Sequence, residues 1–346
     1  MAESEWRPVM HPAGFDNDLR VALEELSAGR WMAVRTLLAR TDTSHGWGLW
    51  TYRSQVLGAS AAGSDVIEAW ESEEPGPTVT VMRARVAVER ALRAYRAEHS
   101  TTDALWHEAL AACGAAVREA PDNPVPWTCF LALAVIDEEQ QAAEHRVRAE
   151  DPMLPSGPWG LLKRAHALDP YNREAYHRML MYWLGRPNPA AVSHADAYAR
   201  WAISRAEQPA GADLLMLPVY VRVERWLRLP REALDMHWLN SYAIHDALAA
   251  FDQWFAVADP ADRSLQDLNC LAHALWAGQR FAEAERVFEA MGRHITPRPW
   301  QYRIADQGNR DQLFGFVALC RAQCVNVAES ASRSAVPPSG RHRSGP

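Results

Sequence analysis

The sequence contains no apolar run approaching the roughly 18 residues that a transmembrane helix needs. The longest uncharged apolar stretch, residues 125–136, is too short to cross a bilayer. The first residues are acidic, whereas a secretory signal opens with a basic segment followed by an apolar one. We therefore expect a cytoplasmic protein that does not bind or span a membrane.

Lysine is almost absent, because Lys163 is the only lysine among 36 basic residues. We attribute this bias toward arginine, together with abundant alanine, to the codon usage of a GC-rich bacterium. The 43 acidic residues outnumber the basic ones and give a net charge of -7. Nucleic-acid-binding domains usually carry a basic surface, so we expect no nucleic-acid partner.

The sequence also lacks the spacing of a metal site. The five cysteines are odd in number and lie among apolar residues, which favours reduced core side chains. They are Cys113, Cys129, Cys270, Cys320 and Cys324. Cys320 and Cys324 are one helical turn apart, but no second Cys or His pair stands at zinc spacing. We expect no bound metal.

Familiar catalytic motifs are missing. The chain has no glycine-rich phosphate loop, no dinucleotide fingerprint, no nucleophile elbow and no complete His-Glu-x-x-His motif. Glu174 and His177 form one Glu-x-x-His, but di-iron bundles need two such motifs and further carboxylates. We nominate no catalytic residue and no cofactor, and we expect the protein not to be an enzyme.

What the sequence does contain is helical periodicity. Apolar residues recur at intervals of three and four, as in residues 19–26, 81–92 and 268–275, while strand-like alternation is nearly absent. Proline and glycine fall between these stretches and separate one helix from the next. The pattern predicts an all-α fold with about 14–16 helices.

The organisation along the chain follows from the same pattern. We expect a short N-terminal extension at residues 1–14 and a helical repeat domain at residues 15–328, with irregular insertions near 42–80 and 137–157. Residues 329–346 are rich in serine, proline and arginine and have almost nothing to bury. They are predicted to form a disordered tail.

Two internal matches indicate repeated helix pairs. Ala-Pro-Asp-Asn-Pro at 120–124 is followed by Trp127, and Leu-Asp-Pro-Tyr-Asn at 168–172 is followed by Tyr176. An alanine lies five residues before the leading proline in each. A further stretch, residues 268–291, alternates large, small and aromatic side chains at regular positions. These positions are Leu271, Ala272, Phe281, Ala284 and Phe288.

The matches resemble the tetratricopeptide repeat, whose antiparallel helix pairs stack into a superhelix. The resemblance implies a right-handed α-solenoid, a TPR-like fold that serves as a scaffold or adaptor and binds a peptide or helix of another protein in its concave groove. One departure is the separation of Pro121 and Pro170 by 49 residues, where the family's repeat has about 34. The lysine and asparagine clamp of some family members does not carry over, since no asparagine stands four residues after Lys163.

The resemblance also implies which residues face the groove, because the first helix of each repeat lines it. Residues three or four apart share one helix face, and the two sets obtained mix histidine with amide, carboxylate and apolar groups. This composition suits recognition of a peptide or helix, although ordinary solvated groove residues look the same. The sets are Glu174, His177 and Met181, and Gln266, Asn269, His273 and Trp276.

The densest polar and aromatic cluster lies at residues 235–255 and supports an alternative function. An enzyme or small-ligand sensor would have its pocket around His237, Asn240 and His245. Trp238, Ser241 and Tyr242 complete this candidate pocket. The two histidines are about 12 Å apart along a helix and cannot share a metal. A buried hydrogen-bond network between helices would explain the same cluster without a ligand.

Overall fold

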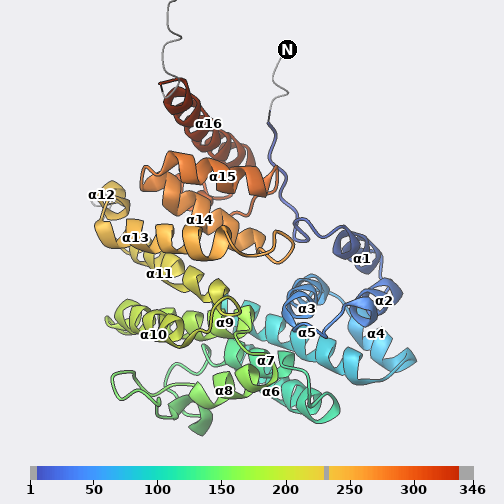
Figure 1. Cartoon of the computed structure of the whole chain (residues 1–346). Coiled ribbons are helices and arrows are strands. Elements are labelled where there is room, and N and C mark those ends of the chain that lie inside the picture. Colours follow the sequence, from blue (N-terminus) through green and yellow to red (C-terminus); the bar gives the residue numbers. More distant parts are fainter. Residues whose placement is uncertain (1–5, 230–233, 335–346) are drawn as a thin grey trace, which may run out of the picture. The chain divides into compact units, whose positions relative to one another are not determined.

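The computed structural model describes residues 6–229 and 234–334, and these residues are predominantly helical (Figure 1). They contain sixteen α-helices and no β-strand, with only two isolated bridges, Val9 to His294 and Val147 to Gly157. The predicted all-α fold class is confirmed. None of the helices in these ranges is both long enough and apolar enough to span a membrane.

The chain divides into two compact units. The large unit comprises residues 12–225 and 257–262, and the small unit comprises 1–11, 226–256 and 263–346. The division at residue 226 falls within α11. Residues 15–328, predicted from the sequence to form one helical domain, are thus divided between the two units.

The large unit holds the first ten helices and most of the eleventh. Their bounds are α1 Asn17–Ser27, α2 Met32–Arg40, α3 Gly48–Ala61, α4 Val66–Glu73, α5 Pro77–Arg96, α6 Thr102–Glu119, α7 Val125–Leu133, α8 Trp159–Leu168, α9 Arg173–Leu184, α10 Ala191–Arg205 and α11 Met216–Leu227. Residues 42–80, expected to be irregular, hold α3, α4 and the start of α5. Residues 137–157 contain only a short 3-10 helix, Ala143–Arg146, and the Val147 bridge.

Small residues form the helix contacts of the large unit. On α6, Ala109, Cys113 and Ala116 share one buried face, and α6 packs against both α5 and α7. Small side chains at a crossing permit close approach of the two helix axes. Large rings fill the wider gaps, as where Trp31 and Trp70 stack with ring centroids 5.6 Å apart.

The small unit stacks its helices in chain order, with α13 against α14, α14 against α15 and α15 against α16 (Figure 1). The bounds are α12 Leu234–Trp238, α13 Ser241–Ala250, α14 Leu265–Ala277, α15 Phe281–Met291 and α16 Arg310–Ser334. Residues 329–334 of the predicted tail therefore belong to α16. The remaining part of that tail, 335–346, lies outside the described residues.

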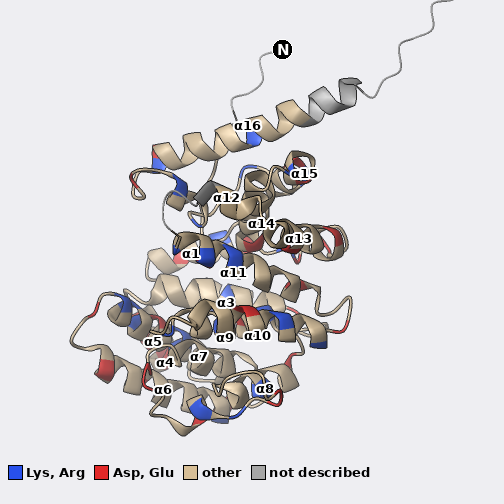
Figure 2. Cartoon of the chain, turned by 90° about the vertical axis from the view of Figure 1, so that its left-hand side faces the viewer, with Lys and Arg blue, Asp and Glu red and all other residues tan. Residues whose placement is uncertain are grey.

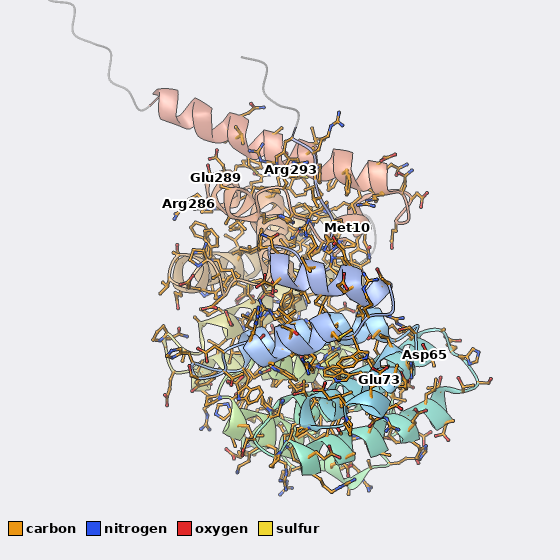
Figure 3. The ribbon with its side chains drawn as sticks, turned by 90° about the vertical axis from the view of Figure 1, so that its right-hand side faces the viewer. Met10, Asp65, Glu73, Arg286, Glu289 and Arg293 are labelled. Carbon is orange, nitrogen blue, oxygen red and sulfur yellow. The ribbon has the colours of Figure 1, made fainter. Side chains whose placement is uncertain are left out.

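The N-terminal segment is tied to the small unit by backbone hydrogen bonds. The Val9 amide donates to the Arg293 carbonyl at 2.6 Å, and the Ile295 amide donates to the Val9 carbonyl at 2.9 Å. The Arg293 side chain, labelled in Figure 3, donates to the Arg7 carbonyl at 2.8 Å. The Trp6 indole donates to the Gly292 carbonyl at 3.0 Å. Residues 6–9 thus act as an ordered strap on the turn after α15.

Candidate functional site

Large side chains are exposed where α12 meets α13. Met236 is 68% exposed, Leu239 40% and Tyr242 70%, and all three lie within seven consecutive positions. The neighbouring side chains of Asn240, Ser241 and His245 are polar and also exposed. We call the α12–α13 surface the set Met236, Leu239, Asn240, Ser241, Tyr242 and His245.

The start of α13 fixes this surface locally. Asn240 has extended backbone geometry, and its side-chain oxygen accepts a hydrogen bond from the Tyr242 amide at 2.9 Å. An asparagine in this position satisfies an amide that the helix itself leaves unpaired. The cap therefore sets the direction in which α13 leaves the turn and holds Tyr242 at its first turn.

Trp238, between these exposed residues, points into the interior of the small unit and is only 1% exposed. Its ring contacts His273 at a centroid distance of 5.1 Å and Trp226 at 6.3 Å. His273 lies 5.3 Å from Trp226. We call this group of rings and its cation the His273 cluster, defined as Trp226, Trp238, His273, Trp276, Trp300 and Arg303.

Arg303 provides the positive charge of the His273 cluster. Its Nε donates to Nε2 of His273 at 3.2 Å, and its guanidinium lies 4.4 Å from the ring centroid of Trp226. Burial, together with the charges of Arg303 and His237, holds the pKa of His273 well below its usual range. The histidine is therefore neutral near pH 7, with its proton on Nδ1 because Nε2 accepts from Arg303.

The tryptophans of this cluster differ in their hydrogen bonding. The Trp276 indole donates to Oε1 of Gln323 at 2.9 Å, and the Trp300 indole donates to Oδ1 of Asn269 at 2.8 Å. The indole nitrogens of Trp226 and Trp238 and Nδ1 of His273 are buried and have no hydrogen-bond partner among the described residues. Such groups are uncommon in folded proteins, so each needs an explanation.

Three of the predicted groove residues are interior side chains. Glu174 is 5% exposed, and Asn269 and His273 are fully buried. The expectation that these three face an open groove is wrong. Asn269 instead joins α14 to the segment after α15, because it also accepts from the Thr296 amide at 3.2 Å.

Glu174 is held by a buried ion pair in the large unit. Its two oxygens accept from Arg85 at 2.7 and 2.6 Å, and Arg178 donates to the same carboxylate at 3.1 Å. Burial alone would raise the pKa of Glu174, but the charges and hydrogen bonds of Arg85 and Arg178 outweigh it and lower that pKa to about 2. This bidentate arrangement links α5 to α9, so its role is structural.

The other four groove candidates are half-buried and already engaged. The His177 ring meets Tyr220 edge-on at 4.8 Å, and Met181 packs against the core of the large unit. The Gln266 amide donates to the Arg298 carbonyl at 3.1 Å. Trp276 belongs to the His273 cluster. Neither predicted set therefore forms an exposed helix face by itself.

The alternative pocket residues divide between surface and interior. Asn240, Ser241, Tyr242 and His245 are exposed, His237 is half-buried, and Trp238 is buried. His237 packs edge-on against Trp238 at 5.0 Å. These six residues consequently do not enclose one common space.

Metal-ligand chemistry is not assembled in the part of the chain that the structure describes. No three His, Cys, Asp or Glu side chains gather there at metal-binding distance. All five cysteines are reduced thiols, and all are buried. Burial, with a contribution from Glu285, raises the pKa of Cys324 to about 12, which keeps this thiol protonated near neutral pH.

Sequence reasoning missed several residues of these two sites. Met236 and Leu239 were available, since with Tyr242 they form a run of large side chains spaced three apart. Trp226, Trp300 and Arg303 gave no local signal, because they come from segments far from His273 in sequence. Only the fold of the small unit brings them together.

Comparison of the chain with family models, with curated proteins and with solved structures finds no match.

Proposed function

We propose that the protein is a helical scaffold that binds a peptide or helix of another protein through the α12–α13 surface. The observation that carries the proposal is the exposure of Met236, Leu239 and Tyr242 on adjoining turns. Exposed apolar side chains scattered singly are ordinary, whereas three in one short segment favour an interaction site. Tyrosine is also enriched among the residues that dominate binding energies.

The surrounding polar groups suit such a partner. Asn240, Ser241 and His245 offer donors and acceptors beside the apolar side chains, so polar contacts can fix the register of a bound segment. An open surface of this kind needs no enclosed cavity and no reactive group. It supports recognition of a protein segment over the alternative of an enzyme or small-ligand sensor at His237, Asn240 and His245.

The scaffold itself is proposed to be a solenoid of antiparallel helix pairs that resembles tetratricopeptide repeats. The pair α14–α15 supports this, because Ala272 and Ala284 at the predicted small positions are fully buried. Phe288, at a predicted aromatic position, is 1% exposed. Stacked pairs of this type present extended surfaces without a catalytic centre.

Selection of peptides from a phage-displayed random library against the intact chain tests the proposal. Selected peptides are resynthesised, and their affinities are measured for the parent chain and for Tyr242→Ala. Loss of a central aromatic contact should weaken binding at least about tenfold. The matched control is Met153→Ala, since Met153 is 86% exposed but lies in the large unit.

The control should bind the same peptides as tightly as the parent. Peptides that bind Tyr242→Ala with undiminished affinity would place recognition elsewhere and contradict the proposal. A selection that enriches no peptide would contradict it as well.

A further inference from the structure

The geometry points to a buried anion site in the small unit, where Trp226, Trp238 and His273 direct unpaired N–H donors into the interior beside the cation Arg303. The ligand class is a small anion or the carboxylate of an organic ligand. This inference goes beyond the proposed recognition of a protein segment and does not depend on it.

The donors form one local group. The ring centroids of Trp226, Trp238 and His273 are 5.1 to 6.3 Å apart, so each ring contacts the other two. All three side chains are at most 1% exposed, and none of their three free nitrogens has an acceptor among the described residues. Bulk water therefore does not satisfy them.

All three nitrogens are hydrogen-bond donors and not acceptors. An indole nitrogen only donates, and the neutral His273 ring carries its proton on Nδ1 because its Nε2 accepts from Arg303. A water molecule accepts two hydrogen bonds but also brings two donors of its own, which need acceptors in turn. An anion beside these N–H groups accepts hydrogen bonds and brings no donor.

The positive charges beside His273 also favour an anion. Arg303 and His237 both disfavour a positive charge on the His273 ring. The Arg303 guanidinium lies over Trp226 and also over Trp276, at 5.5 Å from the latter ring. A negative group in this cluster would gain a charge-assisted partner in a desolvated environment.

An unpaired indole nitrogen alone does not make an anion site. Trp183 and Trp201 in the large unit also have buried indole nitrogens without a partner. In the small unit, by contrast, the indoles adjoin a histidine donor whose tautomer is fixed by an arginine. Trp276 and Trp300, in the same cluster, already have acceptors from the chain and serve as internal controls.

The indole N–H resonances of the full-length chain, labelled with ¹⁵N-tryptophan, provide the test. Sodium chloride, sodium phosphate and sodium acetate are titrated separately, and Trp226→Phe and Trp238→Phe identify the two resonances of interest. We expect saturable downfield shifts of these two, with little change at Trp276 and Trp300. Saturation by acetate alone identifies a carboxylate ligand, and saturation by chloride or phosphate identifies an inorganic anion.

Two variants separate the site from a general salt effect. His273→Phe and Arg303→Gln should each weaken the fitted anion affinity at least about tenfold, because each removes a group that stabilises the charge. If one of these two variants does not fold, the other still tests the inference. Absent or non-saturating shifts, equal shifts of all the indoles, or affinities unchanged in the folded variants would overturn the inference.

Discussion

The buried carboxylate of Glu174 shows how one side chain holds two distant helices. Arg85 lies 89 positions earlier in the sequence, yet both side chains are only 5% exposed and joined by two hydrogen bonds. Removing one partner leaves the other charge buried without compensation. That penalty, more than the attraction itself, makes such a pair sensitive to mutation.

Glu174→Gln is therefore expected to destabilise the large unit by about 3–5 kcal/mol. The matched control is Glu74→Gln, which breaks an ion pair with Arg35 whose side chains are 45% and 49% exposed. The control should cost less than about 1 kcal/mol. Urea unfolding measures both, and equal costs would refute a structural role for the buried pair.

The contribution of Glu174 to stability should depend on pH in the acid range. The pKa of Glu174 falls from 4.5 in the unfolded chain to about 2 in the folded one. Its contribution to stability is complete above pH 4.5 and is lost as the pH falls toward 2, because the unfolded state takes up the proton first. Urea unfolding measured between pH 4.5 and 2 tests this. The free energy of unfolding of Glu174→Gln should fall less steeply with acid than that of the parent chain.

His273 predicts a second pH dependence with the same sign. Its pKa in the folded protein lies well below the unfolded value of 6.5, for which burial is the leading cause. Its contribution to stability is therefore complete above pH 6.5 and decreases by about 1.4 kcal/mol per pH unit below it. His273→Phe should flatten this slope, and an unchanged slope would mean that His273 is accessible to protons when folded.

At the scale of a single helix, α16 has a buried and an exposed side. Leu313, Val317, Cys320 and Cys324 recur at intervals of four and three and are at most 4% exposed, while Leu319 is 66% exposed. The ribbon of α16 in Figure 2 carries few charged residues. Apolar character alone thus does not reveal which side packs against α15.

The two sides should respond differently to truncation. Val317→Ala removes two buried methyl groups and is expected to cost about 2 kcal/mol. Leu319→Ala removes a larger but exposed group and should change stability by no more than about 0.5 kcal/mol. Thermal unfolding compares them, and a greater loss from Leu319→Ala would contradict the orientation of α16.

The N-terminal strap makes a prediction at the same scale. Deleting residues 1–11 removes the Val9 carbonyl that accepts from the Ile295 amide. Hydrogen exchange of that amide should accelerate at least about tenfold. The Ala284 amide, which bonds the Arg280 carbonyl within the small unit, provides the reference and should keep its rate. Unchanged protection of Ile295 would show that the strap is not formed.

Helices and their contact residues could be predicted from sequence because both depend on local periodicity. Ala272 and Ala284 were expected at the small positions of a repeated helix pair, and both are fully buried. Residues 42–80, expected to be an irregular insertion in the repeat, hold α3, α4 and the start of α5. Pro77 begins α5, where the missing amide of a proline costs nothing.

Burial of polar residues could not be predicted in this way. Glu174, Asn269 and His273 have the helical spacing of a solvated face, and their partners Arg85, Trp300 and Arg303 come from other segments. A pattern within one helix cannot show whether a polar side chain finds such a partner. The three residues were therefore assigned to a groove although they lie in the interior.

Across the whole chain, the two units differ in the features that they hold. The large unit contains the Glu174 ion pair and an extended alanine-rich core. The small unit contains the α12–α13 surface and the His273 cluster, to which Trp238 belongs. Under the proposed function, recognition of a partner is confined to the small unit, and the large unit contributes the greater number of helices.

Hydrogen exchange of the intact chain, with and without a peptide selected from the displayed library, tests whether the small unit binds the partner. Bound peptide should slow exchange within residues 234–250 and leave the rates of the large unit unchanged. Slowing confined to the large unit, with residues 234–250 unaffected, would contradict it.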